Sequence, residues 1–140
     1  VIAQFAADAG PADLRDHANV IDRAFSGPSV EAIIQTLRAE DGYFAIETAD
    51  LIESKSPTGL KVTHRQLTRP LPQSFAEVMR MEYRMACHFL VGHDFFEGIR
   101  AAVIDKDRSP KWRPATLAEV DTVAVEANFA PLGSAELSYD

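Results

Sequence analysis

Apolar residues recur at every third or fourth position along most of this chain of 140 residues. That spacing puts them on one face of an α-helix, whereas a half-buried strand needs alternation at every second residue. No segment alternates in that way over enough residues to form a strand. The ranges predicted to be helical are 14–25, 30–40, 43–55, 57–69, 75–91, 94–104 and 122–129. The sequence therefore predicts an all-α fold of orthogonally packed helices.

Capping signals stand at the start of most of these ranges. A Ser, Thr or Asp followed three residues later by Glu can satisfy free N–H groups at a helix start, each side chain bonding the other's backbone. The predicted pairs are Ser74 with Glu77, Asp94 with Glu97, and Thr116 with Glu119. Ser29 is expected to cap the helix that follows it. Ser56 before Pro57 is a further start signal, because Pro loses no useful hydrogen bond at the first helical position.

Length and composition indicate one domain of ordinary soluble type. We expect a single helical domain over 1–140, with an irregular lead-in at 1–13 and a loose tail at 134–140. The net charge of −7 argues against a general nucleic-acid binder. Cys87 is the only cysteine, which excludes an internal disulfide and a cysteine-based zinc site. We expect a reducing intracellular compartment, no leader and no membrane span.

Positive charge gathers in one segment of this acidic chain. Four basic residues lie close to Trp112 in the sequence. Lys106 and Arg108 precede Pro110, and Lys111 and Arg113 lie between Pro110 and Pro114. One interpretation is a clamp for a phosphorylated ligand with an aromatic head, since Lys and Arg bind phosphates. The other is a solvated loop that pins the end of the preceding helix, with Trp112 filling the core. Spacing alone favours the second interpretation.

Other reactive side chains point less clearly to chemistry. His17, His64, His88 and His93 lack the i, i+4 partners of a helical metal site, so structural roles are expected. His93 is expected to bond the end of the preceding helix. Glu82 falls near the apolar face of the helix predicted over 75–91. One interpretation is a buried general acid or base, and the other is an ion pair with Arg80, Arg84 or Arg100. Cys87 is expected to be a small buried residue. We predict no catalytic residue, no metal site and no cofactor in this chain.

Several motifs resemble those of the 3-hydroxyisobutyryl-CoA hydrolases, which belong to the crotonase superfamily. The motifs are Ser56-Pro57-Thr58 with Leu60-Lys61 and Arg65-Gln66-Leu67, Met81-Glu82-Tyr83-Arg84, Gly92-His93-Asp94-Phe95 with Glu97-Gly98-Ile99-Arg100-Ala101, Asp105-Lys106-Asp107 with Ser109-Pro110-Lys111-Trp112, and Leu132-Gly133-Ser134. Their order and spacing agree from about Ile21 to the end of the chain. The resemblance implies the C-terminal helical region of a crotonase-type enzyme, without its N-terminal α/β spiral domain.

The same resemblance implies a function. The family hydrolyses a CoA thioester in valine breakdown, and its glycine-rich oxyanion hole and catalytic acids lie in the N-terminal domain. This chain would close the acyl-CoA site, with that domain as its partner and self-association as a further expectation. Alone, it is expected to be inactive. The expected location is the cytoplasm in a bacterium or the mitochondrial matrix in a eukaryote.

The basic segment also resembles the CoA end of crotonase sites. Lys106 matches the lysine of the superfamily pattern and Lys111 lies within its Pro-x-Phe step, so both are expected to bind CoA. Val103 stands where the superfamily has Phe, which counts against stacking on the adenine. Two alternatives remain: an enoyl-CoA hydratase or isomerase of the same superfamily, and a helical interaction module without catalysis.

Overall fold

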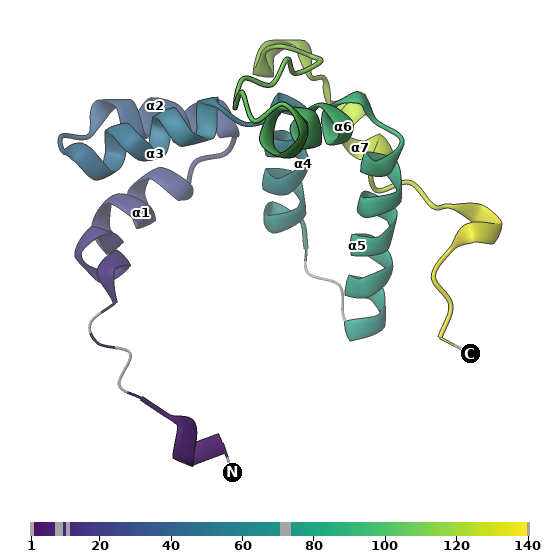
Figure 1. Ribbon diagram of the computed structural model, residues 1–140, viewed down its shortest axis with the longest axis horizontal. Helices are drawn as coiled ribbons and strands as arrows, with labels where there is room; N and C mark the ends of the chain where they lie inside the picture. The colour runs from purple at the N-terminus through teal and green to yellow at the C-terminus, as the bar shows by residue number, and fades with distance from the viewer. Residues whose placement is uncertain (1, 8–9, 11, 71–73, 140) are drawn as a thin grey trace. The chain divides into compact units, whose positions relative to one another are not determined.

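The computed structural model describes residues 2–7, 10, 12–70 and 74–139, and these residues form helices and loops without a strand. They divide into two compact units, 1–50 and 51–140. The first unit contains α1 (Ala18–Phe25), α2 (Val30–Ala39) and most of α3 (Tyr43–Glu53) (Figure 1). Its buried side chains are small or branched and come from all three helices: Ala24, Val30, Ile33, Leu37, Ala45 and Ala49.

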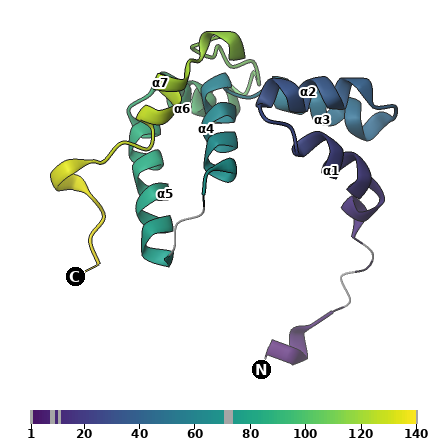
Figure 2. The ribbon, with the colours of Figure 1, turned by 180° about the vertical axis from the view of Figure 1, so that it is seen from behind.

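The second unit contains α4 (Pro57–Thr68), α5 (Phe75–Leu90), α6 (His93–Ile99) and α7 (Thr122–Ala127). In the views from both sides, α4 and α5 run as a pair, with α6 and α7 at one end of it (Figures 1 and 2). A cluster of buried residues joins α4, α5 and α7: Val62, Met85, Val120, Val125 and Phe129. The all-α prediction is confirmed in the described residues.

Short 3₁₀ turns occupy Ile2–Phe5, Asp13–His17, Leu117–Glu119 and Gly133–Ala135. Four residues of the predicted lead-in (1, 8, 9 and 11) and the last residue of the predicted tail lie outside the described residues. So does Pro72, which the sequence predicts, together with Pro70, to end the helix over 57–69. No described helix combines the length and apolar character needed to cross a bilayer.

Most predicted caps are present. The hydroxyl of Ser29 accepts the N–H of Ala32 at 3.2 Å, and that of Ser56 accepts the N–H of Gly59 at 3.0 Å. Ser74 with Glu77 and Thr116 with Glu119 both form complete capping boxes. These contacts span three residues, so a local pattern is enough to predict them.

The predicted pair of Asp94 and Glu97 is wrong. The N-cap of α6 is Gly92, and Asp94 already lies inside the first turn. The predicted helix 94–104 also changes character, because α6 ends at Ile99 and a π-helical segment, Arg100–Ile104, follows it. In that segment the N–H of Asp105 bonds the carbonyl of Arg100 at 2.8 Å, five residues back. Both acids are therefore available for contacts elsewhere.

Candidate functional site

The basic loop, residues 105–113, leaves the π-helical segment through two left-handed residues. Lys106 has φ 58° and Arg108 has φ 52°, a region that non-glycine residues seldom adopt. The N–H of Arg108 then bonds the carbonyl of Ala101 at 3.0 Å, so the chain folds back over the helix it has just left. Such backbone strain persists only where surrounding contacts fix the conformation.

Two acidic side chains of α6 accept backbone N–H groups from the second half of the basic loop. Glu97 accepts the N–H of Lys111 at 2.6 Å, and Asp94 accepts the N–H of Arg113 at 2.8 Å. The acids are three residues apart on the helix, and the amides that they accept are two residues apart in the loop. The loop backbone is fixed to α6 at two successive points.

Trp112 fixes the same segment through two further contacts. Its indole N–H donates to the carbonyl of Ser54 at 2.9 Å, beyond the end of α3. Its ring lies over Gly98, because a methyl group at that glycine would come within 3.5 Å of the ring. A methyl group at Gly98 would make an ordinary contact with the indole, which leaves no space there for a longer side chain. The second interpretation placed Trp112 in the core, and that placement is wrong, because Trp112 is half-buried.

Arg100 gathers the carboxylates around the loop. Its guanidinium bonds both oxygens of Glu97 at 2.7 and 2.9 Å, and it reaches Asp105 and Asp107 at 2.7 Å each. Arg100 and then the N–H of Lys111 hold the pKa of Glu97 at about 2, below its ordinary 4.5. The pKa of Asp107 is lowered by Arg100 and by the N–H of Ser109. The same acids, Glu97 first, raise the pKa of Arg100.

Both acidic side chains of the basic loop, Asp105 and Asp107, are paired with Arg100. Among the described residues, no carboxylate pairs with the side chains of Lys106, Arg108, Lys111 or Arg113, all of which are exposed. The ammonium of Lys111 donates a hydrogen bond to the hydroxyl of Ser109, at 3.2 Å. Four uncompensated cations on a loop fixed at several points form a surface suited to a phosphate or carboxylate ligand.

Asp94 links this loop to α4. Its side chain is 8% exposed. One carboxylate oxygen accepts the hydroxyl of Ser56, the residue that caps α4, at 2.5 Å. The other oxygen contacts Nδ1 of His93 at 3.0 Å and the N–H of Arg113. The Ser56 hydroxyl is therefore directed to a carboxylate and not to the imidazole, which is not the arrangement of a nucleophilic serine.

Glu82 does not fulfil either prediction made for it. Glu82 is exposed, not buried, and its carboxylate accepts a hydrogen bond from the amide of Gln66 on α4 rather than from Arg80, Arg84 or Arg100. The expected partners are engaged elsewhere: Arg84 with Glu136, Arg80 with the carbonyl of Leu137 and Arg100 with the loop acids. Glu82 is thus a surface contact between two helices.

The histidines and the cysteine make ordinary contacts. His17 stacks on Phe44 at 4.0 Å between ring centroids, and Nε2 of His88 contacts the carbonyl of Ala130 at 3.1 Å. His93 contacts Asp94, so its predicted bond to the preceding helix is wrong. Cys87 is half-buried beside Tyr83, whose pKa it raises. Among the described residues, no three His, Cys, Asp or Glu side chains form a group that could hold a metal ion.

The chain belongs to the enoyl-CoA hydratase/isomerase family, whose sequence profile matches residues 1–129. It is 44% identical over 126 residues to the mitochondrial 3-hydroxyisobutyryl-CoA hydrolase of Homo sapiens, covering 90% of this chain and 33% of that protein. The corresponding protein of Danio rerio is 43% identical over 127 residues, covering 91% of this chain and 33% of the relative. The chain therefore spans about a third of the length of these relatives.

Solved structures agree with this assignment. A carnitinyl-CoA dehydratase from Mycobacterium thermoresistibile is 43% identical with a TM-score of 0.87, covering 95% of this chain and 38% of that one. An enoyl-CoA hydratase from Rhodobacter sphaeroides is 36% identical with a TM-score of 0.84, covering 95% of this chain and 40% of that one. The predicted crotonase relationship is confirmed, and so is the helical fold of the matched part.

Proposed function

We propose that this chain is the C-terminal helical part of a CoA thioester hydrolase that acts on 3-hydroxyisobutyryl-CoA in valine catabolism. Residues 1–140 would serve as one region that closes the acyl-CoA site, while the chemistry takes place in an N-terminal crotonase domain. The observation that carries the proposal is an exposed apolar stripe of α6 and the π-helical segment: Phe95, Phe96, Ile99 and Val103. It lies on the same helical stretch as the acids that hold the basic loop.

The apolar stripe favours this proposal over a self-standing interaction module. Phe96 is 60% exposed and Val103 is 63% exposed, and neighbouring Val91 and Ile104 are exposed as well. Large contiguous apolar surface usually marks an interface. The proposed partner of this stripe is the N-terminal crotonase domain, which would correspond to the two-thirds of the relatives' length that this chain does not match. Self-association through the same face is the competing outcome.

Lys106 and Lys111 are the proposed contacts to CoA. Both ammonium groups lack a carboxylate partner among the described residues, while Arg100 holds the three acids that could have neutralised them. Phosphates of an acyl-CoA would supply the missing negative charge. The relatives carry the word mitochondrial in their names. We accordingly propose the mitochondrial matrix for a eukaryotic source and the cytoplasm for a bacterial one.

The deciding experiment is to assay the 140-residue chain and the complete reading frame that encodes it. The substrates are 3-hydroxyisobutyryl-CoA, with release of free CoA as the readout, and a 2-enoyl-CoA, with loss of its conjugated absorbance. We expect CoA release by the complete protein and none by the 140-residue chain. Turnover by the short chain would overturn the proposal. Hydration of the enoyl-CoA without CoA release would favour the alternative hydratase or isomerase activity.

A further inference from the structure

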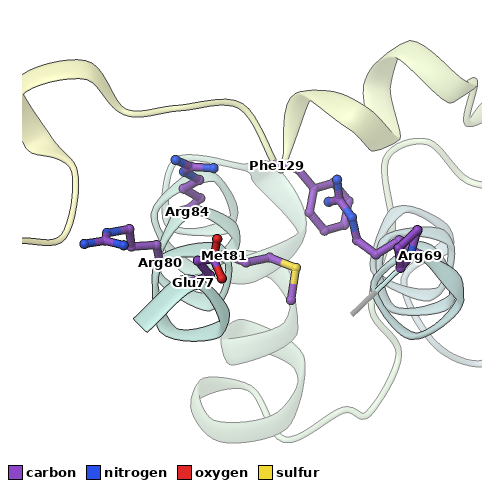
Figure 3. Close-up of a pocket in the computed structure, with 7 residues that line it drawn as sticks. Arg69, Glu77, Arg80, Met81, Arg84 and Phe129 are labelled. Carbon is purple, nitrogen blue, oxygen red and sulfur yellow. The ribbon is translucent and has the colours of Figure 1, made fainter. Parts of the chain in front are cut away.

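An open hollow of about 400 Å³ lies in the second unit, away from the residues of the basic loop. Three arginines line it: Arg69, just after α4, and Arg80 and Arg84, one turn apart on α5. Met81 and Phe129 supply apolar surface, and in Figure 3 the Met81 side chain points toward the side on which Arg69 and Phe129 lie. We call this site the arginine hollow.

The C-terminal segment, residues 136–139, occupies two of these arginines. Arg84 bonds both oxygens of Glu136 through Nε, at 2.9 and 3.0 Å. Arg80 donates to the carbonyl of Leu137 at 3.2 Å and lies 5.3 Å from the ring centre of Tyr139. Figure 3 shows the head of Arg80 turned away from Arg69 and Phe129. Two guanidinium groups that line the arginine hollow are thus directed to the chain's own tail.

Positive charge exceeds negative charge in the lining of the arginine hollow, where three arginines face one carboxylate, that of Glu77. Arg69 lies over the ring of Phe129, 4.5 Å from its centre, and has no carboxylate partner among the described residues. Glu77 is committed to the N-terminus of α5, where it accepts the N–H and hydroxyl of Ser74 at 2.8 and 2.9 Å. Glu136 is the carboxylate that bonds an arginine of the hollow, and Arg84 lowers the pKa of Glu136.

We propose that the arginine hollow binds the diphosphate group of a small molecule, and that Glu136 is an intramolecular competitor for that group. The N–H groups of a guanidinium donate to carboxylate and to phosphate oxygens alike, so a phosphate can replace Glu136 on Arg84. A diphosphate carries enough charge for Arg69 and Arg84 together, whereas one carboxylate engages only Arg84. Met81 and Phe129 would contact the organic part of the ligand. Binding releases residues 136–139 from α5.

Inorganic pyrophosphate is the probe, titrated calorimetrically at low salt into the wild-type chain and its variants. Glu136→Gln should tighten binding about two- to fivefold, the range expected when an exposed ion pair no longer competes. Arg69→Ala and Arg84→Ala should each weaken it about tenfold. Glu47→Gln removes the same charge from the first unit and should leave the affinity unchanged. Equal affinity in wild type and Glu136→Gln overturns the proposal.

A second measurement follows the tail directly. The N–H of Leu132 donates to Glu136 at 3.2 Å, so saturating pyrophosphate should speed hydrogen exchange in the segment that contains it. Unchanged exchange would contradict the proposed competition. The double variant Lys106→Ala/Lys111→Ala separates this site from the basic loop, because the effect of Glu136→Gln should persist in it. Loss of that effect would place the pyrophosphate on the loop instead.

Discussion

The carboxylate of Glu97 accepts the backbone N–H of Lys111 at 2.6 Å, although fourteen residues separate them in the chain. The same carboxylate is held on its other side by Arg100. A side chain inside a helix thereby determines the course of the loop that follows the helix. The proposed CoA contacts, Lys106 and Lys111, depend on this arrangement, because their own side chains make almost no contacts that would place them.

Acid should release the basic loop. The pKa of Glu97 is about 2 in the folded chain and ordinarily 4.5, so the unfolded state binds more protons between these values. The contribution of Glu97 is therefore complete above about pH 4.5 and is lost as the pH falls toward 2. Trp112 is the only tryptophan, so its fluorescence should shift in this window. In Glu97→Gln the shift should already be present at pH 7. A fluorescence profile that is flat from pH 4.5 to 2 would contradict the prediction.

Gly98 tests how closely the indole of Trp112 covers α6. In Gly98→Ala the new methyl group would lie 3.5 Å from the ring, an ordinary contact, and Ala is better than Gly in a helix by up to about 1 kcal/mol. We expect this variant to melt at the same temperature or slightly higher. Gly98→Leu has no room beneath the ring and should lower the melting temperature and red-shift Trp112. Equal behaviour of both variants would mean that the ring is not seated on Gly98.

Local rules predicted the helices well and the site only in part. The caps at Ser29, Ser56 and Ser74 were predictable because each bond reaches three residues along the chain. Asp94 obeys the same local rule in sequence, yet its carboxylate goes to Ser56 and Arg113, 38 and 19 residues away. A pattern of spacing contains no information about those distant partners, so the capping prediction failed there.

The four cations of the basic loop were visible in the sequence, but their lack of partners was not. Asp105 and Asp107 alternate with them, and a reading by spacing would pair these neighbours. In the structure both acids turn to Arg100, which the sequence suggested only as a partner for Glu82. The position of Arg100 among three carboxylates could not be predicted, because no sequence signal announces the π-helical segment that begins at Arg100.

Ser56 should stabilise the fold through two contacts, the cap of α4 and the bond to Asp94, which mutation can separate. Ser56→Ala removes the cap of α4, which costs about 1 kcal/mol, and also the bond to Asp94. Asp94→Asn keeps the cap and weakens the link between α4 and the loop. Chemical denaturation of both single variants and the double variant should show non-additive losses, as expected for residues in contact. Strict additivity would show that the Ser56–Asp94 bond adds nothing to stability.

Lys106 and Lys111 should each matter for CoA affinity and not for folding. In the complete protein, Lys106→Ala and Lys111→Ala should each weaken CoA binding about three- to tenfold, the effect of one charge-assisted contact. The loss should shrink at high salt. Arg15→Ala removes an exposed cation from the first unit and serves as the control. Unchanged affinity in both lysine variants would remove the basic loop from the CoA site.

The apolar stripe should make the 140-residue chain self-associate or bind a hydrophobic dye. Phe96 and Val103 are its most exposed members, and burying such side chains is worth about 1.5–3 kcal/mol each. Phe96→Ser with Val103→Ser should therefore reduce dye fluorescence and light scattering of the isolated chain. Leu67→Ser, at a still more exposed residue on α4, should have a smaller effect. In the complete protein the same pair of substitutions should lower the melting temperature, because the stripe would then be buried. A monodisperse, dye-silent wild-type chain would indicate that this face needs no partner and would favour the interaction-module alternative.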